Sequence, residues 1–273
     1  MASIQRFWEE RARIFGRYLK DFEGSSLRKE NLAFAYRRLA RSVAMGSNND
    51  ISVLKVDLWN EGVDPSRGDV RDFFTSTRNV RLYGIDLSSA ICRLANERTR
   101  ETVEIVCSDL RSQPFRGALF DAIFDVSTLD HLPPASLTLL VSEYSRVLKS
   151  GGALIMIFDS AVTFLWTLQE VQMRIRYHRK ERNPFSPFWW PLHPWYVKNA
   201  VKRHGFKILA EYSLDILPWA LGLNIISRII CRLRLGRGVQ LAVRRLESSS
   251  VSKYLLPLAL QYAIIAAYQP SKD

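Results

Sequence analysis

Cysteine is scarce in this chain, and the placing of its 3 residues excludes two structural roles. Cys92, Cys107 and Cys231 are odd in number and far apart, so they provide neither a disulfide framework nor the spacing of a metal site. This usage is typical of a reducing compartment. We therefore expect a cytoplasmic protein without a metal centre.

Apolar segments of the kind that targeting or membrane insertion requires are also missing. Residues 1–24 are charged throughout and have no apolar core, so they do not form a secretory signal. The uncharged run 254–271 is long enough to cross a bilayer, but it contains Pro257 and Gln261, and we interpret its second half as a strand.

Acidic residues are outnumbered. The 273 residues include 39 Lys and Arg but 27 Asp and Glu, which gives a formal net charge of +12. A basic chain suits an acidic partner: nucleic acid, an anionic membrane surface or an acidic small molecule. The alternative is a basic, solvated surface with no such partner. Hydrophobic residues make up 47% of the chain, which is enough for a sizeable core.

The order of apolar patterns indicates an α/β fold. Two amphipathic helices are expected at 3–20 and 27–45. Short apolar strands then alternate with helices, and these strands are expected at 51–58, 80–87, 103–110, 120–129 and 153–159. Buried strands separated by helices predict a mostly parallel sheet with helices on both faces. Ligands of such sheets bind beyond the carboxyl ends of the strands.

Two carboxylates close neighbouring strands at that edge. Asp86 ends "YGIDLS" and is placed to accept hydrogen bonds from two ribose hydroxyls, although it is equally suited to start the helix that follows. Asp109 ends "VCSDL" and is placed to accept from an exocyclic amine, with Leu110 beside it as an apolar wall. A simple turn residue is the alternative for Asp109.

Two further segments complete a recognisable series: "SQPFRGALFDAIFDVSTLDHL" (112–132) and "RVLKSGG" (146–152). A helix is expected over 134–150, and Gly151 and Gly152 are expected to end it. In this order and spacing, the chain resembles the class I S-adenosylmethionine (SAM)-dependent methyltransferases, in their broad small-molecule group, over about 51–160. The resemblance implies SAM as cofactor and a Rossmann-like, seven-stranded sheet, which an antiparallel pair of strands at 205–214 and 260–270 would complete. It implies that Asp86 and Leu87 bind the ribose, that Asp109 and Leu110 hold the adenine, and that Asp125 and Ser127 line the methionine end.

The first strand departs from that family. The family has an acidic residue followed by three nearby glycines, whereas "LKVDLWNEG" retains Gly62 alone. In one alignment Lys55 stands at the acidic position and Asp57 replaces the first glycine. In the other, Asp57 is the acidic residue and Trp59 replaces the glycine. In either alignment Asp57 or Glu61 could pair with the ammonium of the cofactor.

The best candidate for catalysis is His131, which follows the fourth strand at the cofactor edge. Methyl transfer from a sulfonium is an in-line displacement, and a hydroxyl acceptor often needs a base within hydrogen-bond reach. His131 is expected to be that base, with Asp130 beside it to orient it. A packing histidine is the alternative.

The domain organisation follows from these assignments. Residues 1–48 are expected to form an N-terminal helical cap and 49–273 the methyltransferase domain, with helical insertions in its C-terminal half. The insertion 160–204 mixes basic with aromatic residues and is expected to cover the substrate. The insertion 215–258 contains a basic amphipathic pattern, with Ile225 to Leu233 on one face, that suits an anionic membrane interface. Packing on the sheet edge or in a dimer contact is the alternative for that helix.

Two classes of function stay open. The first is SAM-dependent methylation of an apolar or membrane-associated small molecule, such as a lipid-linked glycan or a quinone, by O-methylation. The second is a catalytically inactive protein of this fold that binds a membrane or a partner. Nucleic acid is an unlikely substrate, because the chain has no tetrapeptide for a flipped base. A nicotinamide-dependent dehydrogenase is less favoured still, because no G-x-G-x-x-G follows the first strand.

Overall fold

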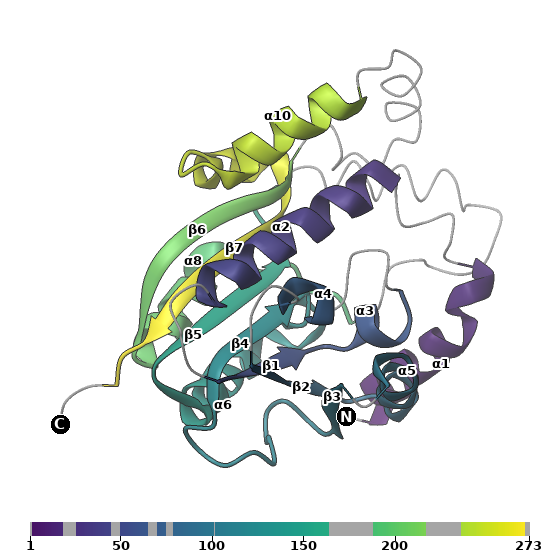
Figure 1. Cartoon of the computed structure of the whole chain (residues 1–273). Coiled ribbons are helices and arrows are strands. Elements are labelled where there is room, and N and C mark those ends of the chain that lie inside the picture. Colours follow the sequence, from purple (N-terminus) through teal and green to yellow (C-terminus); the bar gives the residue numbers. More distant parts are fainter. Residues whose placement is uncertain are drawn as a thin grey trace.

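One sheet of seven strands organises the molecule (Figure 1). The computed structural model describes residues 2–18, 26–44, 50–64, 70–74, 79–100, 102–163, 188–216 and 236–270. Its strands are β1 (Ile51–Val56), β2 (Val80–Asp86), β3 (Val103–Cys107), β4 (Phe120–Val126), β5 (Leu148–Asp159), β6 (Phe206–Ile216) and β7 (Ala259–Tyr268). Their order is β3-β2-β1-β4-β5-β7-β6, parallel except for β7, which is antiparallel to both neighbours. The expected mostly parallel sheet is confirmed.

Helices cover both faces of this sheet (Figure 1). They are α1 (Ala2–Tyr18), α2 (Ser26–Ala44), α3 (Trp59–Gly62), α4 (Val70–Phe74), α5 (Ser89–Thr99), α6 (Leu137–Val147), α8 (Pro194–Arg203) and α10 (Gly236–Ser248). Short 3-10 turns lie at η2 (Leu129–His131), η3 (Pro134–Ser136) and η5 (Ser252–Leu258).

Alternate residues of each strand pack against different helices, as the two-residue period of a strand requires. One core layer joins α2 and α4 to the sheet, and Tyr36 and Phe73 are among its fully buried side chains. The other joins α6 and α8 to the opposite face, with Tyr144 and Val197 buried there. α2 therefore forms part of the sheet's covering, while α1 packs on α5 at the edge. The division of the chain at residue 48 stays a prediction.

The start of β5 differs from expectation. The glycines Gly151 and Gly152 were expected to end a helix over 134–150, but α6 already ends at Val147 and Leu148 pairs with Phe120. The register shifts between Phe120 and Ala122, and both glycines lie inside β5. A Cβ on Gly152 would stand 2.8 Å from the Lys149 carbonyl oxygen, so the irregular pairing requires a glycine there.

Parts of both predicted insertions lie outside the described residues, namely 164–187 and 217–235. The basic run 174–182 and the Ile225–Leu233 pattern fall within them. What is described of the insertions is a loop from Phe188 that bridges to the sheet at Ser160 and Leu192, followed by α8, α10 and η5. Among the described helices, none has the length and apolar character needed to cross a bilayer.

Candidate active site

The turn after β1 takes a conformation that glycine would adopt freely. Asp57 has φ 65°, in the left-handed region that is costly for most side chains and least so for Asn and Asp. Its Oδ1 accepts a hydrogen bond from the Trp59 amide at 2.8 Å, which stabilises the turn. The buried Lys55 ammonium donates to the carbonyl oxygens of Val56, at 2.6 Å, and of Asp57. This geometry favours the alignment in which Lys55 stands at the acidic position and Asp57 replaces the first glycine.

The remaining glycine of this loop serves packing. A Cβ on Gly62 would lie 2.8 Å from the Ile91 carbonyl oxygen, because α3 crosses the backbone of α5 closely. The Leu58 side chain fills the space above Gly84. A Cβ on Gly84 would stand 2.8 Å from Leu58 Cδ2. Glu61 is also buried, and its Oε1 accepts from the Val70 amide at 2.9 Å. Glu61 therefore binds the chain that leads into α4, and its predicted contact with the cofactor stays a prediction.

Asp86 is buried at the end of β2 and holds two loops together. Its Oδ2 accepts from the Leu58 amide at 2.9 Å and its Oδ1 from the Ser88 amide at 2.8 Å. Burial raises its pKa, and these two hydrogen bonds oppose the rise. The cap of α5 is Ser88, whose hydroxyl accepts from the Ile91 amide, so the capping alternative for Asp86 does not apply. Leu87 lies half-buried between the two.

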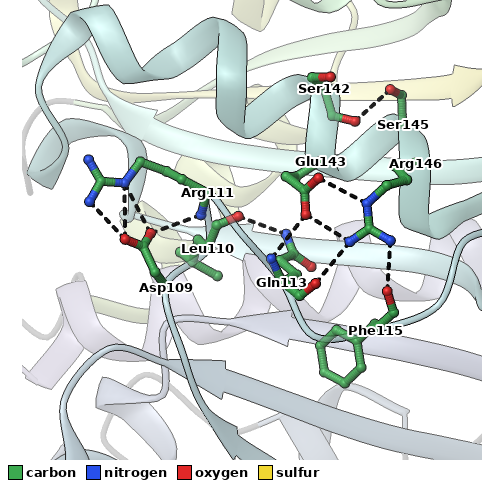
Figure 2. A network of polar contacts seen from close by, with 9 residues as sticks. All are labelled: Asp109, Leu110, Arg111, Gln113, Phe115, Ser142, Glu143, Ser145 and Arg146. Carbon is green, nitrogen blue, oxygen red and sulfur yellow. Dashed lines mark hydrogen bonds and ion pairs between the residues drawn. The ribbon is translucent and has the colours of Figure 1, made fainter.

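Asp109 is paired within the protein (Figure 2). The Arg111 guanidinium contacts both oxygens of its carboxylate, the shorter contact being 2.8 Å, and the Arg111 amide donates to Oδ1 at 2.9 Å. This pairing lowers the pKa of Asp109. Leu110 next to it is buried in the core.

Figure 2 also shows how this loop is attached to α6. Glu143 accepts from the Gln113 amide at 3.0 Å, and Arg146 donates to the carbonyl oxygens of Gln113 and Phe115. Arg146 is in turn bound to Glu143 at 2.8 Å. The loop that follows β3 is thus held in place by α6, which comes later in the chain.

The end of β4 provides two of the predicted residues, in different surroundings. Asp125 has no exposed surface, and its Oδ2 accepts from the Tyr144 hydroxyl at 2.8 Å inside the core. Burial raises its pKa to about 6. Ser127 has φ 56°, and its hydroxyl accepts from the Gln261 amide nitrogen at 3.2 Å. The structure thus places Ser127 at the strand ends and Asp125 beneath them, and their contacts with the cofactor stay predictions.

His131 and Asp130 lie together in η2. The Nδ1 of His131 is 2.9 Å from the Phe188 carbonyl oxygen, so Nδ1 carries the proton and Nε2 is the basic nitrogen. Nε2 lies 3.6 Å from Asp130 Oδ2, which is buried and accepts no hydrogen bond from the residues that the structure describes. Burial lowers the pKa of His131 and raises that of Asp130 to about 7. At neutral pH His131 is therefore uncharged. Its basic nitrogen lies next to the Asp130 carboxyl group, which gains or loses its proton near neutral pH.

Two residues that the sequence analysis did not select, Asp159 and Gln261, complete this edge. Asp159 ends β5, and its oxygens accept from the Trp189 indole at 3.0 Å and from Gln261 at 3.4 Å. Gln261 on β7 joins Asp159 and Ser127 to the Tyr36 hydroxyl of α2. Burial, with Asp130 nearby, raises the pKa of Asp159 to about 7. Its position at a strand end was the available signal; Gln261 gave none, because it lies within an apolar strand.

Trp8 of α1 covers the same edge. Its ring contacts those of His131 and Trp59 edge to face, with centroids 4.8 and 5.8 Å apart. Phe7 beside it contacts Phe188 at 5.6 Å. The first helix therefore lies over the residues that end β1 and β4, and aromatic rings form this side of the site.

Comparison with known proteins identifies the fold family. Residues 65–156 match the sequence profile of a family described as a methyltransferase domain. The match begins just after the altered turn and includes Asp86, Asp109, Asp125 and His131. These residues therefore carry a methyltransferase domain, and the fold is that of the class I SAM-dependent methyltransferases.

Solved structures agree with this methyltransferase fold. A SAM-dependent methyltransferase from Archaeoglobus fulgidus superposes with a TM-score of 0.59 at 16% identity, over 93% of this chain and 99% of that one. Geranyl diphosphate C-methyltransferase from Streptomyces coelicolor A3(2), solved with S-adenosyl-L-homocysteine, gives 0.58 at 17% identity, over 98% and 97%. The [4+2]-cyclase SpnF gives 0.50 at 19% identity, over 86% and 81%. At these identities the likeness shows the fold. A search among curated proteins found no match.

The carboxyl groups at these strand ends fit two of the three parts of SAM, namely the ribose and the positively charged methionine part, and fit the adenine less well. Each oxygen of Asp86 accepts one amide and has a second lone pair for a ribose hydroxyl. Asp57, Asp130 and Asp159 have raised pKa values in low-dielectric surroundings, which suits a cation such as a sulfonium or ammonium. At the adenine part the fit is altered, since Arg111 already occupies Asp109.

Proposed function

We propose that this protein transfers the methyl group of SAM to an apolar small molecule, for which a lipid-linked glycan or a quinone are the leading classes. The observation that carries the proposal is the accumulation of carboxyl groups at the carboxyl ends of β1, β2, β4 and β5. Burial raises the pKa values of Asp57, Asp130 and Asp159, and repulsion from neighbouring carboxyls adds to the rise. A bound cation would relieve that repulsion, and SAM carries its positive charge on the reacting sulfonium.

The roles of the cofactor-binding residues follow from their places at these ends. Asp86 with Leu87 would hold the ribose. Asp57 would pair with the ammonium of the methionine part, with Ser127 beside it and Lys55 fixing the turn from below. When bound, SAM supplies an electrophilic methyl group, and the protein has to align the acceptor with it and exclude water.

His131 would act as the base for a hydroxyl acceptor. Its Nδ1 proton is committed to the Phe188 carbonyl, so Nε2 is the atom that would receive the acceptor's proton. Asp130 lies 3.6 Å from that nitrogen and would stabilise the imidazolium formed. The rings of Phe7, Trp8 and Phe188 make this side of the site apolar, which supports an apolar acceptor.

Titration calorimetry with SAM and with S-adenosylhomocysteine tests the cofactor part of this proposal. We expect micromolar binding, and we expect Asp86→Ala to abolish it. Because Asp86 also holds two backbone amides, Asp86→Asn is the gentler variant and should weaken binding by at least tenfold, the worth of about one charge-assisted hydrogen bond. Asp50→Asn, at an exposed position preceding β1, is the matched control and should bind as the native protein does.

Methyl transfer itself is tested with SAM that carries a labelled methyl group and a lipid extract. The label should enter the extract with the native protein and not with His131→Asn, while His131→Asn still binds SAM. A folded native protein that binds neither SAM nor S-adenosylhomocysteine would contradict the proposal.

A second candidate function rests on the turn after β1. Asp57 occupies the position of the family's first glycine in the favoured alignment, and a [4+2]-cyclase shares this fold. The alternative is a protein of this fold that does not transfer methyl groups and binds a membrane or another partner. Binding of SAM without labelled product in any extract would favour it.

A further inference from the structure

Helix α10 turns a polar face toward the rest of the protein. Glu247 is 1% exposed; its Oε1 accepts from the Ile216 amide at 3.1 Å and its Oε2 from Asn31 at 2.8 Å. Gln240 lies seven residues before Glu247, about two turns away on the same face, and donates to Glu30 of α2 at 3.1 Å. Arg244 donates to Asn31 and lies over the Phe34 ring. These bonds fix the rotation of α10 on α2 and β6.

Because the polar face points inward, apolar side chains point to the solvent. Leu241 is 55% exposed and Leu246 is 39% exposed on the outer side of α10. The chain continues into η5, which packs against α10, and Tyr254 there is 73% exposed. Rotating α10 to bury the leucines would break the contacts of Glu247, so their exposure is built into the packing.

Basic side chains accompany these apolar ones. Arg237 and Arg245 are exposed on the same side of α10, and the Lys253 ammonium lies 5.1 Å from the Tyr254 ring. Within residues 236–254, all of which are described, the single acid is Glu247, which faces inward. An exposed face that combines leucine and tyrosine with arginine and lysine, without acids, has the character of a helix that lies at an anionic bilayer surface.

We propose that the outer surface of α10 and η5, formed by Arg237, Leu241, Arg245, Leu246, Lys253 and Tyr254, docks on a membrane that contains anionic lipids. The leucines and the tyrosine enter the interface, and the three cations lie at the level of the lipid phosphates. The positive charge of the surface favours an anionic membrane over a neutral apolar partner, because a neutral partner would not interact with the arginines electrostatically. The proposal does not depend on methyl transfer.

Vesicle flotation with the full-length protein tests it. Phosphatidylcholine vesicles with roughly one-third phosphatidylglycerol should carry the protein, and pure phosphatidylcholine should carry at least tenfold less, since each basic residue near an anionic surface strengthens binding severalfold. Raising the salt to about 0.5 M should release most of it. Arg237→Gln/Arg245→Gln/Lys253→Gln and, separately, Leu241→Gln/Leu246→Gln should each weaken binding at least tenfold.

Two matched controls keep the test specific. Arg93→Gln/Arg98→Gln/Arg116→Gln removes the same charge from exposed positions elsewhere, and Leu139→Gln changes a leucine that is 53% exposed on α6. Both should bind vesicles as the native protein does. Equal losses in controls and α10 variants would overturn the proposal. So would a native dimer in light scattering that Leu241→Gln/Leu246→Gln converts to a monomer, because the face would then be covered by a second copy.

Discussion

Two glycines in this chain have opposite surroundings, and the same substitution should therefore have opposite effects. A methyl group on Gly62 would meet the Ile91 carbonyl oxygen at 2.8 Å, and backbone atoms in a packed helix pair cannot move away cheaply. A methyl group on Gly238 in α10 would meet nothing within 4 Å. We expect Gly62→Ala to lower the free energy of unfolding by about 1–3 kcal/mol. Gly238→Ala should raise it by up to about 1 kcal/mol, through helix propensity. Urea unfolding followed by circular dichroism measures both, and a neutral Gly62→Ala would contradict the close packing of α3 on α5.

Single residues also show how far the sequence specifies the site. Asp86, Asp130 and His131 were predictable, because each ends a strand or follows one at the edge where parallel strands bind ligands. Trp8 and Gln261 were not, because their roles depend on which elements become neighbours in space. The partner of Asp109 was missed for a simpler reason: Arg111, two residues away, was close enough to pair but equally able to face solvent.

At the scale of elements, the contact of α10 with the sheet should make stability depend on pH. Burial, supported by Asp215, raises the pKa of Glu247 to about 8 from an ordinary value of 4.5, so the folded state holds this proton more tightly than the unfolded state. The stabilisation it gives is complete below pH 4.5 and is lost as the pH rises through about 8. In the native protein this proton should make the free energy of unfolding fall by a few kcal/mol across the range. We expect Glu247→Gln to flatten the accompanying fall in melting temperature. Glu30→Gln on α2 is the matched control, and an unchanged slope in Glu247→Gln would refute the assignment.

The elements themselves were largely predictable. The first five strands were expected close to their places, because buried parallel strands form short apolar runs bounded by turns. The last two were expected from the resemblance to the methyltransferase family. The ends of the strands were less well predicted: β3 stops at Cys107 although the apolar pattern extends to Leu110, since the chain turns there to bind α6 through Glu143. The helix expected in the basic insertion, at Ile225–Leu233, lies outside the described residues. α10 follows it in the same insertion, and its outward leucines could not be foreseen without its contacts to Asn31 and Ile216.

At the scale of the whole molecule, a basic protein surrounds an acidic site, and pH should act on its stability and on its cofactor binding in opposite directions. The pKa of Asp57 is raised to about 6 and those of Asp130 and Asp159 to about 7, mainly by burial. Without cofactor, their contribution to stability is complete below the ordinary value of 3.8 and is lost as the pH rises toward 7. If SAM binds as proposed, its affinity should increase over this same range, because its cation pairs with the ionised carboxyls.

Calorimetry in buffers of different ionisation enthalpy would count the protons released when SAM binds near pH 6. We expect net release, reduced in Asp159→Asn and unchanged in Asp50→Asn. Binding without proton release, at an affinity independent of pH, would show that these carboxyls do not face the cofactor.

The position of β7 has a consequence for the order in which the molecule assembles. β7 comes last of the strands in the chain, yet it lies between β5 and β6 and pairs with both. During synthesis β6 therefore leaves the ribosome with no strand beside it, while β5 exposes an open edge that another chain could extend. Sheet completion has to wait for residues 259–268, and the same step brings Gln261 to Ser127 and Asp159. The site is thus assembled only when the sheet closes, so a nascent chain that stalls before β7 would be both prone to aggregate and inactive.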